Sequence, residues 1–257
     1  INPKAEIWCV DIADVDEDWE EIFDGVKVVF HTAAKARVQP SIKNPVEFDR
    51  TNVGGTINML DCSRKYGVER FVYSSSSSIY GNVEIVPTKE ETEPNPLSPY
   101  GLQKLIGEQY CRLFSDLYGL STTCLRYFNV YGERQPLEGA YCLVMGIFAR
   151  QKMNGEPLTI RGNGHQRRDF TYVGDVVDAN LRAAFNDLVL KGEPFNIGNG
   201  DNRSVKHIAK LIGGKTKNVD PVTEPKETLA DNNKASFFLG WEPKGDLEKW
   251  IKIYKEK

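Results

Sequence analysis

Short apolar segments alternate with helix-like segments along the first half of the chain, and this alternation constrains the fold more than any other feature. Residues 26–31 are apolar on both faces, which is typical of a strand buried in a parallel sheet. The helix-like segment 45–66 follows, and strand-like segments recur at 70–75 and 121–126. Strands that alternate with helices in this way predict an α/β fold with a doubly wound, parallel sheet.

The two ends of the chain have a different character. Residues 5–10 alternate like a strand, and residues 14–23 have the pattern of an acidic helix. After Gly132 a polar loop precedes short segments with helix or strand patterns, namely 143–153, 157–160, 203–212, 233–239 and 247–254. We therefore expect one domain over residues 1–132 and, over residues 133–257, mainly a smaller lid that is interleaved with the last sheet strand at about 170–200.

A serine-rich turn and the helix after it predict a site for proton transfer. The strand at 70–75 runs into a row of serines at 74–78. Pro99 then suits the first turn of a helix, where its missing N–H costs nothing, and Tyr100 and Lys104 share one face of that helix. A lysine ammonium beside a phenol favours the phenolate, and a serine hydroxyl can share its proton, as a carbinol–ketone interconversion requires. A Tyr-x-x-x-Lys pair alone is unspecific, because it can equally be an exposed helical pair, but its combination with the strand and the serines is selective.

This combination resembles the extended short-chain dehydrogenase/reductase family, and within it the nucleotide-sugar 4-epimerases. Matching residues follow the family's order along nearly the whole chain. They are residues 11–12, 31–34, 52–56, 74–81, Tyr100 with Lys104, 125–132, 155–160, 168–170, 195–198 and 239–241. The resemblance implies a Rossmann-type sheet, bound NAD, and epimerisation at C4 of a UDP-hexose through a transient 4-keto sugar.

The same resemblance implies a role for each matching residue. Tyr100 is the general base, Lys104 lowers its pKa and holds the nicotinamide ribose, and Ser76 hydrogen-bonds the substrate hydroxyl. The further contacts implied for NAD are Asp11, Ile12, Thr32, Ala33, Ala34, Asn52, Ser74 and Tyr127. The contacts implied for the nucleotide sugar, besides Ser76, are Asn129, Arg168 and Thr228. Alternative interpretations are close packing for the small residues 32–34 and a core aromatic for Tyr127. Arg161 and Arg167 lie near Arg168 in the sequence, and either could instead be a solvated surface charge.

The choice of substrate depends on two segments. Thr228 matches the position beside the 2-substituent of the sugar, and its small side chain predicts that UDP-GlcNAc and UDP-GalNAc are accepted as well as UDP-Glc and UDP-Gal. The loop before it departs from the family pattern, because Pro221 stands where the family has a diphosphate-binding arginine. This departure leaves the nucleobase and the sugar open.

Other activities on the same scaffold remain possible. The family's dehydratases and decarboxylases place acidic residues in the turn where this chain has Ser76, Ser77 and Ser78, so the serines favour epimerisation. A reductase, or a truncated relative without catalysis, is a further alternative. The combination of Tyr100, Lys104 and Ser76 argues against a protein without catalysis.

A glycine-rich phosphate-binding turn, which the fold places after its first strand, does not occur in the printed sequence. Ile1 enters just before what resembles the third strand. The first two strands of such a sheet lie between the third and the fourth, so without them the third strand would lack its neighbours. We therefore expect a first βαβ unit of about 50–60 residues upstream of Ile1 in the natural protein. The segment that selects NAD or NADP would lie there.

Composition limits the partners and the compartment. A formal charge of −3 gives no reason to expect nucleic acid, and no apolar run reaches the ~18 residues that span a membrane. Five widely spaced cysteines suit free thiols in a reducing cytoplasm, and three scattered histidines argue against a metal centre. The resemblance implies a homodimer formed by the helices at 52–66 and 100–118. Cys111, Leu113, Phe114 and Leu117 supply apolar surface on the second of these helices.

Overall fold

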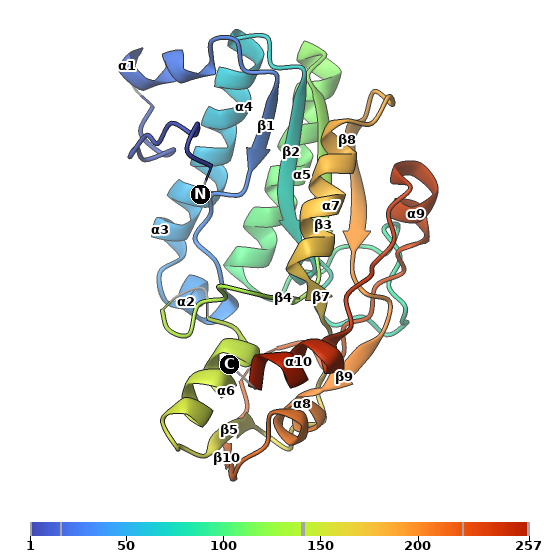
Figure 1. Ribbon diagram of the computed structural model, residues 1–257. Coiled ribbons are helices and arrows are strands. Elements are labelled where there is room, and N and C mark those ends of the chain that lie inside the picture. Colours follow the sequence, from blue (N-terminus) through green and yellow to red (C-terminus); the bar gives the residue numbers. More distant parts are fainter. Residues whose placement is uncertain (1, 16, 140–141, 223, 256–257) are drawn as a thin grey trace.

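The computed structural model describes residues 2–15, 17–139, 142–222 and 224–255, and its centre is a parallel sheet (Figure 1). The strands β1 (Val28–His31), β2 (Arg70–Ser76), β3 (Ser121–Tyr127) and β8 (Lys191–Ile197) are neighbours in that order. Every pairing between them is parallel. The predicted doubly wound α/β fold is therefore confirmed.

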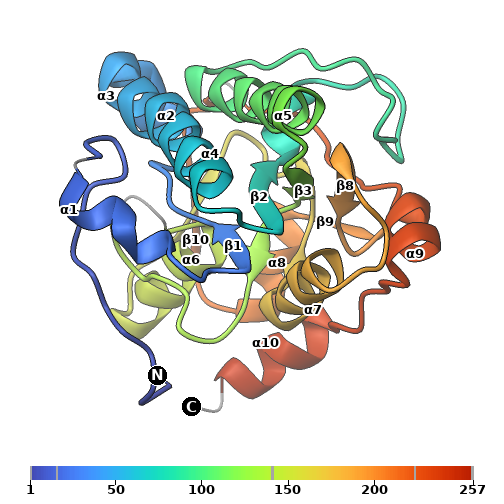
Figure 2. The same ribbon diagram turned by 90° about the horizontal axis from the view of Figure 1, so that it is seen from above.

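Helices cover both faces of this sheet, as Figure 2 shows. The helices α4 (Gly55–Lys65) and α5 (Pro99–Tyr118) lie on one face, and α7 (Val173–Ala184) lies on the other. The predicted helix at 45–66 is not one regular helix. It consists of α3 (Pro45–Asp49), a π-helical turn η2 (Arg50–Gly54) and α4.

Local signals in the sequence explain where α5 begins and ends. The Ser98 hydroxyl accepts a hydrogen bond from the Gly101 N–H at 3.2 Å, and Pro99 occupies the first turn. Gly119 ends the helix with a φ of 71°, which suits a residue without a Cβ. These signals set Tyr100 in the first turn and Lys104 one turn later.

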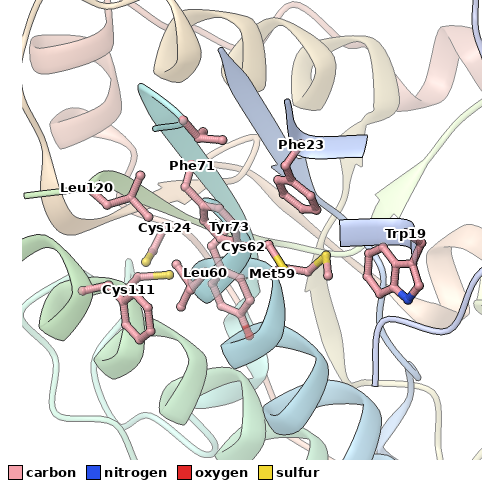
Figure 3. Close-up of a cluster of buried hydrophobic side chains, with 12 residues drawn as sticks. Trp19, Phe23, Met59, Leu60, Cys62, Phe71, Tyr73, Cys111, Leu120 and Cys124 are labelled. Carbon is pink, nitrogen blue, oxygen red and sulfur yellow. The ribbon is translucent and has the colours of Figure 1, made fainter. Parts of the chain in front are cut away.

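A hydrophobic core fills the space between the sheet and the α4–α5 face (Figure 3). Leu60, Phe71, Tyr73, Cys111 and Cys124 are fully buried there. Each cysteine of the described chain is a free thiol. Because Cys111 and Phe114 point into this core, the prediction that they supply surface for a partner subunit is wrong.

A second group of elements lies beyond the carboxyl ends of the strands (Figure 1). Its core packs Phe148, Leu158, Ile208 and Ile251 together. Its members are α6 (Val144–Met153), β5 (Leu158–Arg161), α8 (Val205–Ile212), β10 (Thr216–Val219) and α10 (Leu247–Lys255). Short strand pairs connect it to the sheet, namely β4 (Val130–Tyr131) with β7 (Thr171–Tyr172) and β6 (Arg167–Asp169) with β9 (Asn202–Ser204). The division into residues 1–132 and 133–257 stays a prediction.

The remaining elements are short. They are α1 (Glu17–Glu20), η1 (Glu21–Phe23), α2 (Val38–Lys43), η3 (Ser77–Ile79) and α9 (Asn233–Leu239). No helix within the described ranges is long and apolar enough to cross a membrane.

The prediction of a strand at residues 5–10 is wrong. This segment is irregular and mostly exposed, and 81% of Ile7 is accessible to solvent. An alternating pattern forms a strand only where a neighbouring strand takes its backbone hydrogen bonds, and none of the described strands pairs with it. The predicted helix at 14–23 is also shorter, since only α1 and η1 form there.

Candidate active site

The serine-rich turn lies against the first turn of α5 at the carboxyl end of β2. Ser76 ends the strand, and its hydroxyl accepts hydrogen bonds from the Ser78 N–H at 3.2 Å and from the Ser78 hydroxyl at 2.9 Å. A Cβ added to Gly101 would lie only 2.6 Å from the Ser78 carbonyl oxygen. The absence of a side chain at Gly101 therefore lets the turn approach the helix beside Tyr100.

Lys104 is buried beneath this turn, with 3% of the residue exposed. Its ammonium donates a hydrogen bond to the Ser74 carbonyl at 2.8 Å and lies 4.8 Å from the centre of the Tyr73 ring. Burial lowers the pKa of Lys104 to about 8, although Cys111 and Glu108 act in the opposite direction. The lysine is therefore still largely a cation at neutral pH, next to the helix turn that carries Tyr100.

Tyr100 is half-buried, and a helix that the sequence did not reveal holds its backbone. The Tyr100 N–H donates a hydrogen bond to the Ser41 hydroxyl of α2 at 3.1 Å. Ser41 is buried and also donates to the Val38 carbonyl at 2.7 Å. The α2 helix thus fixes the start of α5.

A buried ion pair connects α5 to the sheet, and sequence reasoning missed it. Arg126 of β3 donates to both carboxylate oxygens of Glu108, at 2.9 and 2.7 Å, with 5% and 7% of the two side chains exposed. Glu108 also accepts from the Ser75 hydroxyl at 2.5 Å, and Arg126 donates to the Tyr80 hydroxyl at 2.7 Å. One bidentate pair therefore ties α5, the serine turn and β3 together. Glu108 lies one helical turn beyond Lys104, which is the only signal that could have found it.

The residues assigned to NAD by position lie around the ends of β1 and β2. Thr32 and Ala33 follow β1 and are exposed, so small side chains leave the carboxyl end of this strand open to a dinucleotide. Ala34 is half-buried. This arrangement fits NAD, because ligands of such sheets bind where the strands end.

Asn52 holds the loop after β1 by hydrogen bonds to the backbone of that loop. Its amide accepts from the Lys35 N–H at 2.8 Å and donates to the Lys35 carbonyl at 2.9 Å and to the Gln103 side chain at 3.0 Å. The side chain is 1% exposed. Asn52 therefore fixes the loop after β1 against α5.

Asp11 and Ile12 lie beside the start of α4. The Asp11 carboxylate is exposed and lies 3.4 Å from the Arg50 guanidinium. Ile12 packs on Gly55, where an added Cβ would lie 2.6 Å from the Ile12 side chain, and its carbonyl accepts from the Asn58 amide at 2.9 Å. Asp11 is accordingly accessible to a ligand, whereas Ile12 is packed against the protein.

Ser74 and Tyr127 are neighbours on adjacent strands. Their hydroxyl oxygens lie 3.1 Å apart, and the Tyr127 hydroxyl also accepts from the Asn180 amide of α7 at 2.8 Å. Burial raises the pKa of Tyr127, although Ser74 and Asn180 oppose the shift. Tyr127 is therefore a fixed neutral hydrogen-bonding group at the end of β3.

The residues assigned to the nucleotide sugar gather on β6 and the neighbouring loops. The Asn129 amide donates to the Thr228 hydroxyl at 3.3 Å and to the Asp169 carbonyl at 3.0 Å. Arg168 is buried beside Asp169, and its guanidinium donates to Glu224 at 2.6 Å. The structure thus brings Asn129, Arg168 and Thr228 together, while Ser76, Tyr100 and Lys104 form a separate group on β2 and α5.

Asp169 organises this second group. Its carboxylate is fully buried and accepts backbone hydrogen bonds from Asn199 at 2.7 Å, Gly200 at 3.0 Å and Ala230 at 3.0 Å. Burial raises the pKa of Asp169 to about 6, and these N–H groups oppose the shift. Nothing in the sequence besides its place after Arg168 pointed to this role.

Comparison with known proteins places the chain in a family. The sequence model described as the NAD dependent epimerase/dehydratase family matches residues 2–198. The chain belongs to this family. The predicted relationship to the extended short-chain dehydrogenases and reductases, and to NAD-dependent enzymes, is therefore confirmed.

Individual relatives agree with this assignment. A UDP-glucose 4-epimerase homologue from Methanocaldococcus jannaschii is 42% identical over 260 residues, which cover 98% of this chain and 83% of the relative. The structure of the Thermotoga maritima UDP-glucose 4-epimerase with UDP-glucose matches with a TM-score of 0.93 and 38% identity, and covers 100% of this chain and 85% of that chain. The UDP-glucuronic acid 4-epimerase of Bacillus cereus, solved with UDP-glucuronic acid and NAD, matches with a TM-score of 0.88 and 30% identity over 96% of this chain and 79% of that chain.

The chemistry of the described residues sets one further limit. Within the described ranges, no three side chains of His, Cys, Asp or Glu gather so that they could hold a metal ion. The family assignment identifies the chain as a member of an NAD-dependent epimerase family, and its relatives include UDP-sugar 4-epimerases.

Proposed function

We propose that the protein epimerises a UDP-hexose at C4 with NAD as cofactor. The observation that carries the proposal is the placement of Tyr100 and the buried Lys104 on one turn of α5, against the serine turn that contains Ser76. Relatives that bind UDP-glucose and UDP-glucuronic acid support the substrate class. Bound NAD would supply the redox chemistry at C4, where a hydride leaves one face of the sugar and is restored to the other.

Tyr100 removes the proton of the C4 hydroxyl in this proposal, and Lys104 makes that possible. Lowering the pKa of a tyrosine from about 10 to about 7 requires roughly 4 kcal/mol of preferential stabilisation of the phenolate. At an effective dielectric near 20, an ammonium about 4 Å away contributes roughly this amount and a more distant one contributes less. The positive nicotinamide ring of NAD, when bound, would add to the effect of Lys104. Ser76 holds the hydroxyl in line for the transfer.

The second group of residues holds the nucleotide part of the substrate. Arg168 can donate two hydrogen bonds to a diphosphate, and the Asn129 amide is bonded to the carbonyl of the next residue, Asp169. The Thr228 hydroxyl already contacts the Asn129 amide and the Asp169 N–H, at 3.3 and 3.2 Å. These contacts hold Thr228 in the second group. Because its side chain is small, we expect it to leave room for an N-acetyl group, so that N-acetylhexosamines are accepted along with plain hexoses.

Replacement of Tyr100 by phenylalanine tests the proposal. The full-length wild-type protein with NAD should interconvert UDP-glucose and UDP-galactose without release of NADH. Tyr100→Phe should lower kcat at least ~100-fold and leave KM nearly unchanged, because only the proton acceptor is lost. Tyr118→Phe, at the exposed end of the same helix, is the matched control and should keep full activity.

The products of the same assay decide between related activities. UDP-GlcNAc and UDP-glucuronic acid are offered beside UDP-glucose, and each product is identified by its sugar. A near-normal rate for Tyr100→Phe would show that another group is the base. Loss of water or of CO₂ from the sugar would instead indicate a dehydratase or a decarboxylase.

A further inference from the structure

A carboxylate of the chain itself holds the arginine that the proposed function assigns to the substrate diphosphate. Glu224 accepts a hydrogen bond from Arg168 at 2.6 Å and another from the Gln166 amide at 3.2 Å. Only 10% of the Arg168 side chain is exposed, against 32% of the Glu224 side chain. Glu224 thus reaches from the surface to a buried cation.

The backbone places Glu224 at this position. Its loop runs beside β6, where the Arg167 N–H donates to the Lys226 carbonyl at 3.0 Å and the Thr228 N–H donates to the Arg167 carbonyl at 3.1 Å. The Lys226 N–H also donates to the Asn82 side chain at 3.2 Å, which anchors the loop near the end of the serine turn. The contact between Glu224 and Arg168 is therefore fixed by hydrogen bonds on the following residues.

The two neighbouring arginines of β6 have separate acidic partners. Successive side chains of a strand point to opposite faces, so Arg167 and Arg168 diverge. Arg167 lies 3.7 Å from Glu227 and donates to the Asn202 side chain, whereas Arg168 pairs with Glu224. Glu227 is thus a natural control for Glu224 on the same loop.

A diphosphate cannot share Arg168 with Glu224 without strong repulsion between like charges. We propose that Glu224 competes with the substrate diphosphate for Arg168 and so sets the affinity of the enzyme for UDP-linked ligands. Binding then exchanges one ion pair for another, and release of the product restores the pair with Glu224. This inference rests on the proposed role of Arg168 in holding the diphosphate.

Calorimetric titration of the NAD-loaded protein with UDP and with uridine tests the competition. Glu224→Gln keeps the shape and the contact with Gln166 but removes the charge, so UDP should bind about tenfold more tightly. Uridine lacks the phosphates, so its affinity should not change. Glu227→Gln should change neither affinity.

A double-mutant cycle locates the effect at Arg168. Arg168→Gln should weaken binding of UDP, and adding Glu224→Gln to it should give no further gain, because the competed group is gone. Unchanged or weaker UDP binding by Glu224→Gln would overturn the inference and make Glu224 a support for Arg168. A gain for uridine equal to that for UDP would overturn it as well.

The two proposals can fail separately. Absence of epimerase activity in the full-length wild-type protein would refute the proposed function but leave the comparison of UDP with uridine intact. If the wild-type protein is an active epimerase but Glu224→Gln leaves its affinity for UDP unchanged, only the proposed competition is refuted. In an active enzyme, the KM for the UDP-sugar should fall with the dissociation constant of UDP.

Discussion

His31 is a buried imidazole that the fold holds in its neutral form. It is 3% exposed, stacks on the Tyr73 ring, and lies with its Nε2 2.9 Å from the Thr56 hydroxyl. That hydroxyl donates its own proton to the Asn52 carbonyl at 2.6 Å, so His31 must donate to it from Nε2. Burial, with a smaller effect from Lys104, lowers the pKa of His31 to about 3.

This shift predicts a loss of stability in acid. The unfolded chain takes up a proton at His31 near pH 6.5, and the folded chain does not until about pH 3. The free energy of unfolding should therefore fall as pH decreases from 6.5, at up to about 1.4 kcal/mol per pH unit from this residue. Asp169, whose pKa is raised to about 6, acts in the opposite direction below that pH.

Urea denaturation between pH 4.5 and pH 7.5 measures the effect by comparison of variants. His31→Gln should remove the dependence that His31 contributes, whereas His165→Gln, an exposed histidine, should not. The difference between variant and wild type isolates His31 from Asp169 and the other acids. Equal slopes for all three proteins would contradict the assignment.

The sequence could reveal a site residue only where its interaction partners lie at a recognisable spacing along the chain. Ser76, Tyr100 and Lys104 are recognisable because a strand, a turn and a helix place them at fixed spacings. Glu108 and Arg126 are 18 residues apart and on different elements, so only the folded chain shows that each neutralises the other. The Glu224 partner of Arg168 is likewise 56 residues away.

At the scale of elements, the sequence predicted α5 well and missed α2 and α7. The α5 helix has a capping serine, a proline in its first turn and a glycine after its end. The α7 helix begins after Tyr172 without a capping side chain, and α2 begins after Arg37, whose φ is 87°. Their formation depends on packing against the rest of the protein, which local signals do not record.

Loss of one partner from the ion pair between α5 and β3 should destabilise the protein more than replacement of both partners by apolar residues. Glu108→Gln should lower the free energy of unfolding by about 3–5 kcal/mol, because Arg126 stays buried without its counter-charge. The double variant Glu108→Leu/Arg126→Met should recover much of this loss. Denaturant unfolding followed by fluorescence measures both.

An exposed pair provides the control for this experiment. Lys27 and Glu69 are 72% and 60% exposed, so Glu69→Gln should change the unfolding midpoint little. A Glu108→Gln protein as stable as wild type would show that Arg126 is satisfied by Tyr80 and the Glu90 carbonyl alone. In that case the pair would not be what connects α5 to the sheet.

At the scale of the whole molecule, the sheet and its two helical layers could be predicted because buried parallel strands leave a clear apolar pattern. The paired strands β4 with β7 and β6 with β9 could not, since they are short and their paired residues lie 33 to 41 positions apart in the sequence. These small pairs set Arg168 and Asp169 beside Asn129. The grouping of Arg168, Asp169 and Asn129, which we propose as the substrate side of the site, thus depends on contacts that only the complete fold creates.

The last prediction concerns the assembly of two copies. Leu102, Leu113 and Leu117 are 47%, 47% and 62% exposed on α5, and they lie on the face that points away from the sheet core. The chain should form a two-fold symmetric dimer through this face, since self-complementary contacts bury such a surface with one interface. Sedimentation at micromolar concentration should give twice the mass of one subunit. Leu113→Glu should yield monomers, while Phe237→Glu, 82% exposed on α9, should leave the dimer intact. A wild-type monomer, or a dimer that survives Leu113→Glu, would exclude α5 as the interface.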